Sequence, residues 1–346
     1  MTRRSPLSVG VPVLDEFAGS VLAVNFGSYP RIGDVPSEQK LRRALHGADR
    51  GEITPDELTA VEREVVKAVL AEQAEAGLDV LSDGQIAWYD ALSHLARRLD
   101  GTEVGGLLRW FDNNFYYRQP MLTGPVRWQR PMLLDELEFA GAAADRPLKA
   151  VVTGPLTFAS LSNDAHYGSL AAAALAIAEA LNREIHSWGD LELAYVQVDE
   201  PSFGAATDVG LLREAWAALT RDLVVPLVIA PYFGDVSRSF TRLYDLGAAG
   251  YHVDARSHAG NASAVDAAGF PEGAALSLGV LDARNTRLEV AAQVAGEVEA
   301  LRSGLPSSSP LLVTSNCGLE FLPRDTARRK LRLLSEVRDT VAGALR

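Results

Sequence analysis

The stretch PLLVTSNCGLEFLPR, residues 310–324, decides the fold class because it joins a short apolar run to a polar turn. Residues 310–313 have the length and composition of a buried strand. The only cysteine of the chain, Cys317, follows this run and stands beside Gly318. A thiol at a strand end is placed to meet a ligand, although free cysteine is also among the residue types most often buried as small hydrophobes.

Apolar runs of strand length recur along the chain, each ending in small or polar residues. The eight predicted strands are residues 21–26, 78–81, 150–152, 194–198, 224–229, 250–253, 275–281 and 310–313. Continuous apolar strands that alternate with helices predict a parallel sheet covered on both faces, and eight such units predict closure of that sheet. The fold class is therefore α/β, a single (β/α)8 TIM barrel, for which 346 residues is a suitable length.

Helical patterns lie between these strands. The sequence TPDE at residues 54–57 predicts an N-cap, an N1 proline and an acidic first turn before a helix over residues 58–75. Further helices are predicted over residues 169–187, 286–302 and 325–345.

One segment, residues 101–146, has no α/β repeat and is dense in aromatic residues. We interpret it as an insertion at about 101–147, after the second βα unit of a barrel that spans residues 21–346 behind an N-terminal segment of residues 1–20. Long insertions on barrels often build the functional site. The alternative is a small satellite core that covers one edge of the barrel.

Composition excludes several classes of partner. A net charge of -12 argues against nucleic acid, whose phosphates require a basic surface, and disfavours an anionic membrane. One cysteine excludes an internal disulfide framework. No window approaches the ~20 apolar residues that span a bilayer, and Pro12, Asp15 and Glu16 interrupt any signal-peptide core. A cytoplasmic location is expected.

In a parallel barrel the carboxyl ends of all strands meet on one face, so the residues after each strand are the candidates for chemistry. The candidates in chain order are Gly27, Ser28, Arg31, Gln85, Asp199, Glu200, Tyr232, His252, Asp254 and Cys317.

Seven segments in register carry a resemblance to a known family. They are FGSYPRIG, WFDNNFYY, TGPLTF, VQVDEPSF, YFGDV, LSLGVLDARN and SNCGLEFLPR, and they extend over nearly the whole chain. Together they resemble cobalamin-independent methionine synthase, and the layout is similar to that of a short, single-barrel relative. The resemblance implies an enzyme, a methyltransferase that forms methionine from homocysteine, with no cobalamin bound by the chain itself.

The resemblance also implies a zinc ion that deprotonates the thiol of the substrate. Family ligands map to Cys317 and, as a shorter carboxylate, to Asp254. The family's His-x-Cys pair falls on Pro231 and Phe233, which cannot bind a metal. His252 would point to the same side of an extended strand as Asp254 and completes a predicted three-ligand zinc site. The alternative is a histidine hydrogen-bonded within the barrel.

The resemblance assigns the amino-acid substrate to a further set of residues. The predicted substrate-binding residues are Gly27, Ser28, Gln85, Asp199, Glu200 and Tyr232. Asp199 and Cys317 are the predicted catalytic residues, Asp199 because it matches the aspartate that holds the α-amino group of homocysteine. Glu200 has the alternative role of bracing the turn before Pro201. Gln85 replaces a family glutamate by an amide, which should weaken its hold on an ammonium group.

Residues predicted to bind the methyl donor lie mostly in the insertion. They are Arg31, Trp110, Asp112, Asn114 and Tyr116. Packing of the insertion is the alternative for the last three, and a surface carboxylate is the alternative partner for Arg31. The acceptor is expected to be homocysteine or another amino-acid thiol, and the donor a folate or a corrinoid protein.

Two other functions stay open. The replaced ligands at Pro231 and Phe233 favour a metal-free barrel that binds an amino acid or regulates a partner without chemistry. The fold also allows a related barrel methyltransferase or decarboxylase with another substrate.

Overall fold

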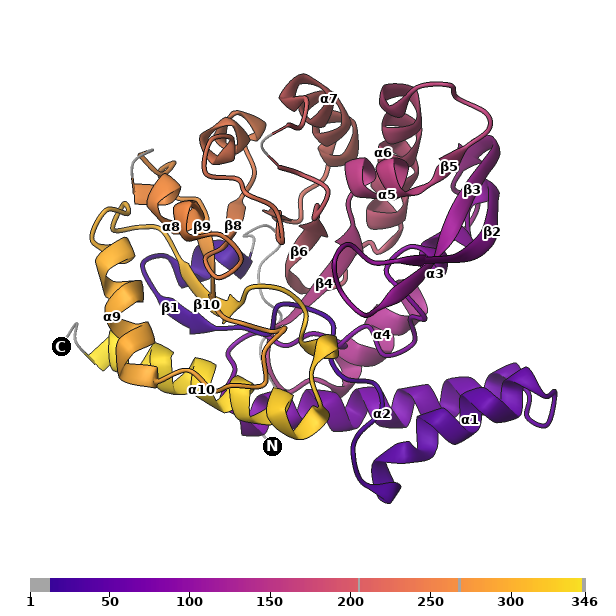
Figure 1. Cartoon of the computed structure of the whole chain (residues 1–346), viewed down its shortest axis with the longest axis horizontal. Coiled ribbons are helices and arrows are strands. Elements are labelled where there is room, and N and C mark those ends of the chain that lie inside the picture. Colours follow the sequence, from indigo (N-terminus) through magenta and orange to yellow (C-terminus); the bar gives the residue numbers. More distant parts are fainter. Residues whose placement is uncertain (1–12, 205, 267–268, 344–346) are drawn as a thin grey trace.

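A computed structural model describes residues 13–204, 206–266 and 269–343, in which parallel strands form a closed barrel (Figure 1). Seven strands pair in the order β1-β10-β9-β8-β7-β6-β4. They are β1 (Val21–Ala23), β4 (Leu148–Thr153), β6 (Leu193–Asp199), β7 (Leu227–Ala230), β8 (Gly250–Asp254), β9 (Ala275–Leu281) and β10 (Leu311–Ser315). Parallel bridges from Val24 to Val80 and from Leu81 to Leu148 supply the eighth strand and close the ring. The predicted TIM barrel is confirmed.

Most of the predicted strands overlap these elements to within two residues, but β1 ends at Ala23 and not at the predicted Phe26, and the fifth strand also differs. The prediction began it at Val224, but β7 begins at Leu227 and the Val224 side chain is 81% exposed. Pro226 lies between them and has no N–H to give to the sheet, so the ladder starts after it.

Helices surround the strands, as Figure 1 shows. In the described residues the α-helices are α1 (Lys40–Asp49), α2 (Pro55–Glu75), α3 (Ser93–Ala96), α4 (Leu134–Ala143), α5 (Pro155–Leu161), α6 (Leu170–Ser187), α7 (Val209–Thr220), α8 (Ala259–Asp266), α9 (Ala291–Arg302) and α10 (Arg324–Gly343). The 3-10 helices are η1 (Val13–Phe17), η2 (Pro36–Gln39), η3 (Phe240–Leu246) and η4 (Leu319–Phe321).

Capping residues define where the long helices begin. Thr54 and Glu57 form the reciprocal capping box of α2, with Glu57 N donating to Thr54 Oγ1 at 3.2 Å. Ser169 caps α6 as predicted. Helix α9 begins at Ala291, later than predicted, because Glu289 in the preceding loop accepts from Asp282 N and pairs with Lys330. The predicted end of α10 at residue 345 lies outside the described residues.

The aromatic-rich segment forms a hairpin beside the barrel. Strands β2 (Asp100–Arg109) and β3 (Tyr116–Arg127) are antiparallel, and the short β5 (Asn163–Asp164) pairs with β3. Strands β2 and β3 lie between the second barrel strand and α4 in the chain, whereas β5 follows α5, and β3 contacts α6. The hairpin therefore stands on the outer wall of the barrel and brings its tip, residues 110–115, toward the carboxyl ends of the strands.

The amino-terminal end of the barrel is closed by apolar packing. Leu14 of η1 belongs to one buried cluster with strand residues, among them Leu22, Val80 and Leu312. This cluster fills the bottom of the ring and leaves the opposite end for polar groups. None of the helices in the described part of the chain is both long and apolar enough to cross a bilayer.

Candidate functional site

Four predicted residues gather at the carboxyl end of the barrel. Burial raises the pKa of Tyr232 well above its ordinary value, and the charges of Asp199, Glu320, Cys317 and Glu200 raise it further. These charges act on the Tyr232 hydroxyl although the groups come from the end of β6, the loops after β6 and β10, and η4. The predicted convergence of strand ends brings acidic groups into one small region.

Asp199 is the last residue of β6 and is half-buried. Its Oδ1 accepts from Gln197 Nε2 at 2.7 Å, and no residue in the described ranges donates to its Oδ2. Burial raises the pKa of Asp199 to about 7, while the Gln197 hydrogen bond and the charge of Lys149 act in the opposite direction. One oxygen is thus held by the strand and the other is available to a ligand.

Glu200, the next residue, is fully buried and faces a helix terminus. Its carboxylate accepts from Leu156 N at 3.0 Å, from Thr157 N at 2.7 Å and from Thr157 Oγ1 at 2.6 Å. A negative group at the start of α5 is favoured by the free N–H groups there. These bonds occupy both oxygens of Glu200, which agrees with its alternative role as a bracing residue; its contact with substrate stays a prediction.

Gly27 and Ser28 lie in the loop after β1, against the loop after β10. Ser28 O accepts from Leu319 N at 2.9 Å. A Cβ added to Gly318 would overlap both the Ser28 hydroxyl and the Glu320 carboxylate. Glycine at position 318 is therefore what lets the two loops come together, and it places Ser28 beside Glu320.

Gln85 lies in a tight turn after the second strand. Its φ of 53° is in the left-handed region, and its N–H donates to Asp83 Oδ1 at 3.1 Å. Gly84 O accepts from Tyr29 N at 3.0 Å, so this turn contacts the loop that holds Ser28. The predicted neighbourhood of the first two loops is confirmed.

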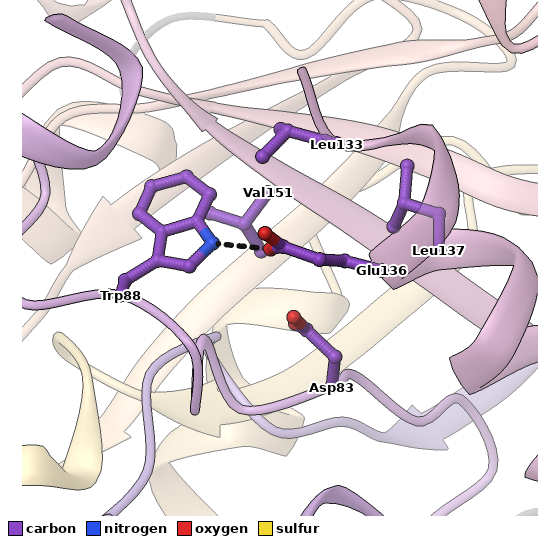
Figure 2. A pocket seen from close by; sticks show the side chains of 6 residues that line it. All are labelled: Asp83, Trp88, Leu133, Glu136, Leu137 and Val151. Atoms are coloured by element: carbon purple, nitrogen blue, oxygen red, sulfur yellow. Dashed lines mark hydrogen bonds between the residues drawn. The ribbon is translucent and has the colours of Figure 1, made fainter. Parts of the chain in front are cut away.

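A small cavity lies beside Asp83 (Figure 2). It measures about 10 Å³ and is lined by Asp83, Trp88, Leu133, Glu136, Leu137 and Val151. Glu136 accepts from Trp88 Nε1 at 3.1 Å, and burial raises the pKa of Asp83 to about 6. A cavity of this size holds one water molecule at most, so it is too small for an amino acid.

The three predicted metal ligands are engaged within the protein. Cys317 is 0% exposed, its Sγ lies 3.6 Å from Asn316 Oδ1, and burial raises the pKa of its thiol. His252 Nδ1 pairs with Ser277 Oγ at 2.9 Å and its Nε2 with Asn316 O at 3.2 Å. Both ring nitrogens are thus used, as in the alternative of a histidine bonded within the barrel.

Asp254 is held by the loop that follows it. Its carboxylate accepts from Arg256 N at 2.9 Å, from Ser257 N at 2.8 Å and from Phe233 N at 3.1 Å. Among the described residues, no group of three or more His, Cys, Asp or Glu side chains is arranged to hold a metal ion. The residues present therefore do not fit the zinc site predicted from Cys317, His252 and Asp254, because their donor atoms are committed to neighbouring protein groups.

The residues predicted to bind the methyl donor come from two parts of the chain, Arg31 from the loop after β1 and the others from the hairpin around its tip. Arg31 donates to Trp88 O and lies over the Tyr89 ring, 5.4 Å from its centroid. Trp110 is buried against Tyr117 at the base of the hairpin tip. The side chains of Asn114 and Tyr116 are exposed. The burial of Trp110 agrees with the alternative of a small satellite core in the aromatic-rich segment.

The hairpin tip reaches across the mouth of the barrel. The Phe115 ring contacts Phe321 of η4 at a centroid distance of 4.8 Å. Asp112 Oδ1 accepts from Arg284 NH1 at 2.8 Å, and Phe111 lies 5.4 Å from Phe233. The tip therefore joins loops that follow β7, β9 and β10, and it covers the region around Tyr232.

Sequence reasoning missed three polar residues near Asp199. Lys149 and Gln197 lie on β4 and β6 inside the barrel, and Glu320 lies in η4. Burial raises the pKa of Glu320 to about 8, and its Oε2 is buried with no hydrogen-bond partner among the described residues. The available signal was a polar residue beside or within an apolar run: Lys149 precedes the run 150–152, and Gln197 interrupts the run 194–198.

Comparison with known families matches the chain to cobalamin-independent synthases. Residues 94–305 match the family model described as cobalamin-independent synthase, N-terminal domain. A methionine synthase of Sulfolobus acidocaldarius is 30% identical over 306 residues, which cover 87% of this chain and 88% of the relative. A 5-methyltetrahydropteroyltriglutamate–homocysteine methyltransferase of Thermotoga maritima is 32% identical over 175 residues, 50% of this chain and 24% of the relative.

Solved structures show the same fold. A B12-independent methionine synthase from Shewanella sp. W3-18-1, in complex with selenomethionine, matches with a TM-score of 0.77 and 18% identity, over 93% of this chain and 98% of that chain. A putative vitamin-B12 independent methionine synthase from Listeria monocytogenes matches with a TM-score of 0.67 and 18% identity, over 92% and 96%.

Proposed function

Because the chain belongs to the cobalamin-independent methionine synthase family, we propose that it binds a sulfur amino acid at the mouth of its barrel and transfers a methyl group to the thiol of homocysteine. Relatives named methionine synthase share most of their length with this chain, which supports a common reaction. Methyltetrahydropteroyltriglutamate is the proposed donor, after the name of the Thermotoga maritima relative.

The observation that carries this proposal is the setting of Asp199. One of its oxygens is held by Gln197, and the other has no described donor at the open end of the barrel. A carboxylate in this position attracts the α-ammonium group of an amino acid, and the pairing repays part of its desolvation. Ser28, in the loop that touches Gly318, is the proposed contact of the amino-acid carboxylate.

Glu320 is the proposed acceptor of the thiol proton. Its pKa of about 8 lies close to the ordinary thiol pKa of about 8.5, so proton transfer between the two is nearly balanced. The thiolate then attacks the methyl carbon, the S–C bond forms as the donor's N–C bond breaks, and the donor nitrogen takes up a proton. No step is assigned to zinc, because the predicted ligands are engaged elsewhere.

The test is methionine formation from homocysteine and methyltetrahydropteroyltriglutamate by the purified protein and by Asp199→Asn. We expect turnover by the wild type and a KM for homocysteine at least tenfold higher in the variant, since an amide carries no charge for the ammonium group. Thr314→Val is the control, because the Thr314 hydroxyl is buried without a described partner and lies outside this set. Equal KM values for the Asp199 variant and the wild type would contradict the assignment.

A second candidate is an amino-acid-binding barrel without chemistry. The sealed, protonated thiol of Cys317 and the phenylalanine at position 233 favour it. Isothermal titration with methionine separates the two: binding without any turnover on folate or corrinoid donors supports this second function, and turnover excludes it.

A further inference from the structure

Lys149 is a buried lysine inside the barrel that the proposed reaction does not use; burial lowers its pKa to about 7, and the charge of Asp199 acts in the opposite direction. It is 1% exposed, and its Nζ donates to Phe26 O at 2.6 Å and to Gln197 Oε1 at 2.6 Å. Both acceptors are neutral, and the rings of Tyr195 and Phe26 lie 5.3 and 5.8 Å from Nζ. A buried ammonium without a directly bonded carboxylate is costly, so its contacts need an explanation beyond packing.

The contact with Gln197 determines how that amide is turned. A charged lysine has only donors, so the amide oxygen of Gln197 must face it. The amide nitrogen is then directed to Asp199, and Nε2 donates to Oδ1 at 2.7 Å. Turning the amide over would set NH2 against NH3+ at one end and oxygen against carboxylate at the other.

We propose that Lys149 is a positioning residue, which acts through Gln197 to hold Asp199 in one orientation with one oxygen free for the ammonium group of the substrate. This inference deepens the proposed function and rests on it for the identity of the ligand. The three side chains form one hydrogen-bonded chain from β4 to the end of β6, with bonds of 2.6 and 2.7 Å. The hydrogen-bonded arrangement also holds the positive charge of Lys149 near Asp199 and polarises the Gln197 amide between them, which favours the ionised carboxylate.

Other charged groups lie near these three hydrogen-bonded side chains and also shift pKa values there. Glu200 raises the pKa of Asp199, and Asp199 in turn raises those of Glu320 and Tyr232. Lys149 lowers the pKa of His252 on β8. Among these groups Lys149 supplies the positive charge that favours an ionised Asp199, so its removal should raise the Asp199 pKa.

The experiment measures methionine affinity between pH 5.5 and 9 for Lys149→Met, Gln197→Met and the double variant. Each single change should weaken binding at pH 7 about five- to tenfold and move the midpoint of the pH profile upward by about one unit. The double variant should lose no more methionine affinity than either single variant, because each single change already breaks the same series of hydrogen bonds. Additive losses, or an unchanged pH profile in Lys149→Met, would overturn the assignment.

A second measurement separates this inference from the proposed function. The carboxyl pKa of Asp199 is followed by carbon NMR in the ligand-free wild type and in Lys149→Met, with Thr314→Val as the matched change inside the barrel. A higher Asp199 pKa in Lys149→Met, but not in Thr314→Val, supports the hydrogen-bonded Lys149–Gln197–Asp199 arrangement even if no methionine binds. Absence of methionine binding would then contradict the proposed function only. Methionine binding with an unmoved Asp199 pKa leaves the function standing and refutes the role of Lys149.

Discussion

Three carboxyl groups, those of the half-buried Asp199 and Glu320 and of the fully buried Glu200, lie at the same end of the barrel. Burial raises their pKa values to about 7, about 7 and about 8. The ordinary values, 3.8 for aspartate and 4.5 for glutamate, apply to the unfolded chain. Folding therefore takes up protons at neutral pH, and stability should fall as the pH rises through this range.

Glu320→Gln tests this link at one residue. A group with a raised folded pKa contributes its full stability below pH 4.5, and the contribution is lost as the pH rises through about 8. Glutamine cannot ionise, so we expect the variant to be about 4 kcal/mol more stable than the wild type at pH 9 and equal to it near pH 4.5. Urea unfolding at both pH values measures the difference. A gap that does not change with pH would show that Glu320 is not the group responsible.

The hairpin is the element that decides access to these residues. Its tip is held over the mouth by the Phe115–Phe321 contact and by the Asp112–Arg284 pair, in which Asp112 is 77% exposed. An exposed ion pair contributes about 0–1 kcal/mol and an aromatic pair about 0.5–1.5 kcal/mol. The cover is therefore weakly held, which suits a segment that must move when a ligand enters.

Removal of two of the three described tip contacts in Asp112→Asn/Phe115→Ala, which leaves only the Phe111–Phe233 contact, should open the cover. We expect amide hydrogen exchange to become at least tenfold faster in residues 110–115 and in the 319–321 turn, with no change in β4. Hydrogen exchange followed by mass spectrometry measures this. Asp245→Asn is the control, because the Arg213–Asp245 pair is also exposed and has the same kind of geometry at 2.9 Å. Unchanged exchange at 319–321 would mean that the tip does not cover the mouth.

At the scale of the whole molecule, metal should not be needed for the fold. The donor atoms of His252 and Asp254 are hydrogen-bonded within the protein, and Cys317 is buried as a thiol. We expect far less than one equivalent of zinc in the purified protein, and no change in Tm or in methionine affinity after treatment with a chelator. Copurification of one zinc per chain, with a lower Tm after its removal, would require the loops at Asn316 and Ser257 to rearrange.

The barrel itself was predictable because its strands are buried on both faces and read as continuous apolar runs. The boundary error at Val224 has a local cause, Pro226, that the sequence already contained. The engagement of the predicted zinc ligands with other protein groups was not predictable in the same way. Strand periodicity indicates that His252 and Asp254 share a side, but it does not reveal that Asn316 and Ser257 take up their donor atoms.

Lys149 escaped prediction for a related reason. Its partners are a carbonyl of the first loop and a side chain of β6, which are distant in sequence and meet only when the ring is closed. A lysine before an apolar run reads equally well as a solvent-exposed residue at the start of a strand. The role of such a residue follows from the closed topology and not from its own neighbours in the chain.

The pairing of β1 with β10 has a consequence for synthesis in the cell. Val21 is opposite Leu311, so one edge of the earliest barrel strand has no neighbour until the ribosome has released the chain through residue 315. During translation that edge is exposed to other nascent chains, and shielding it is a task for chaperones.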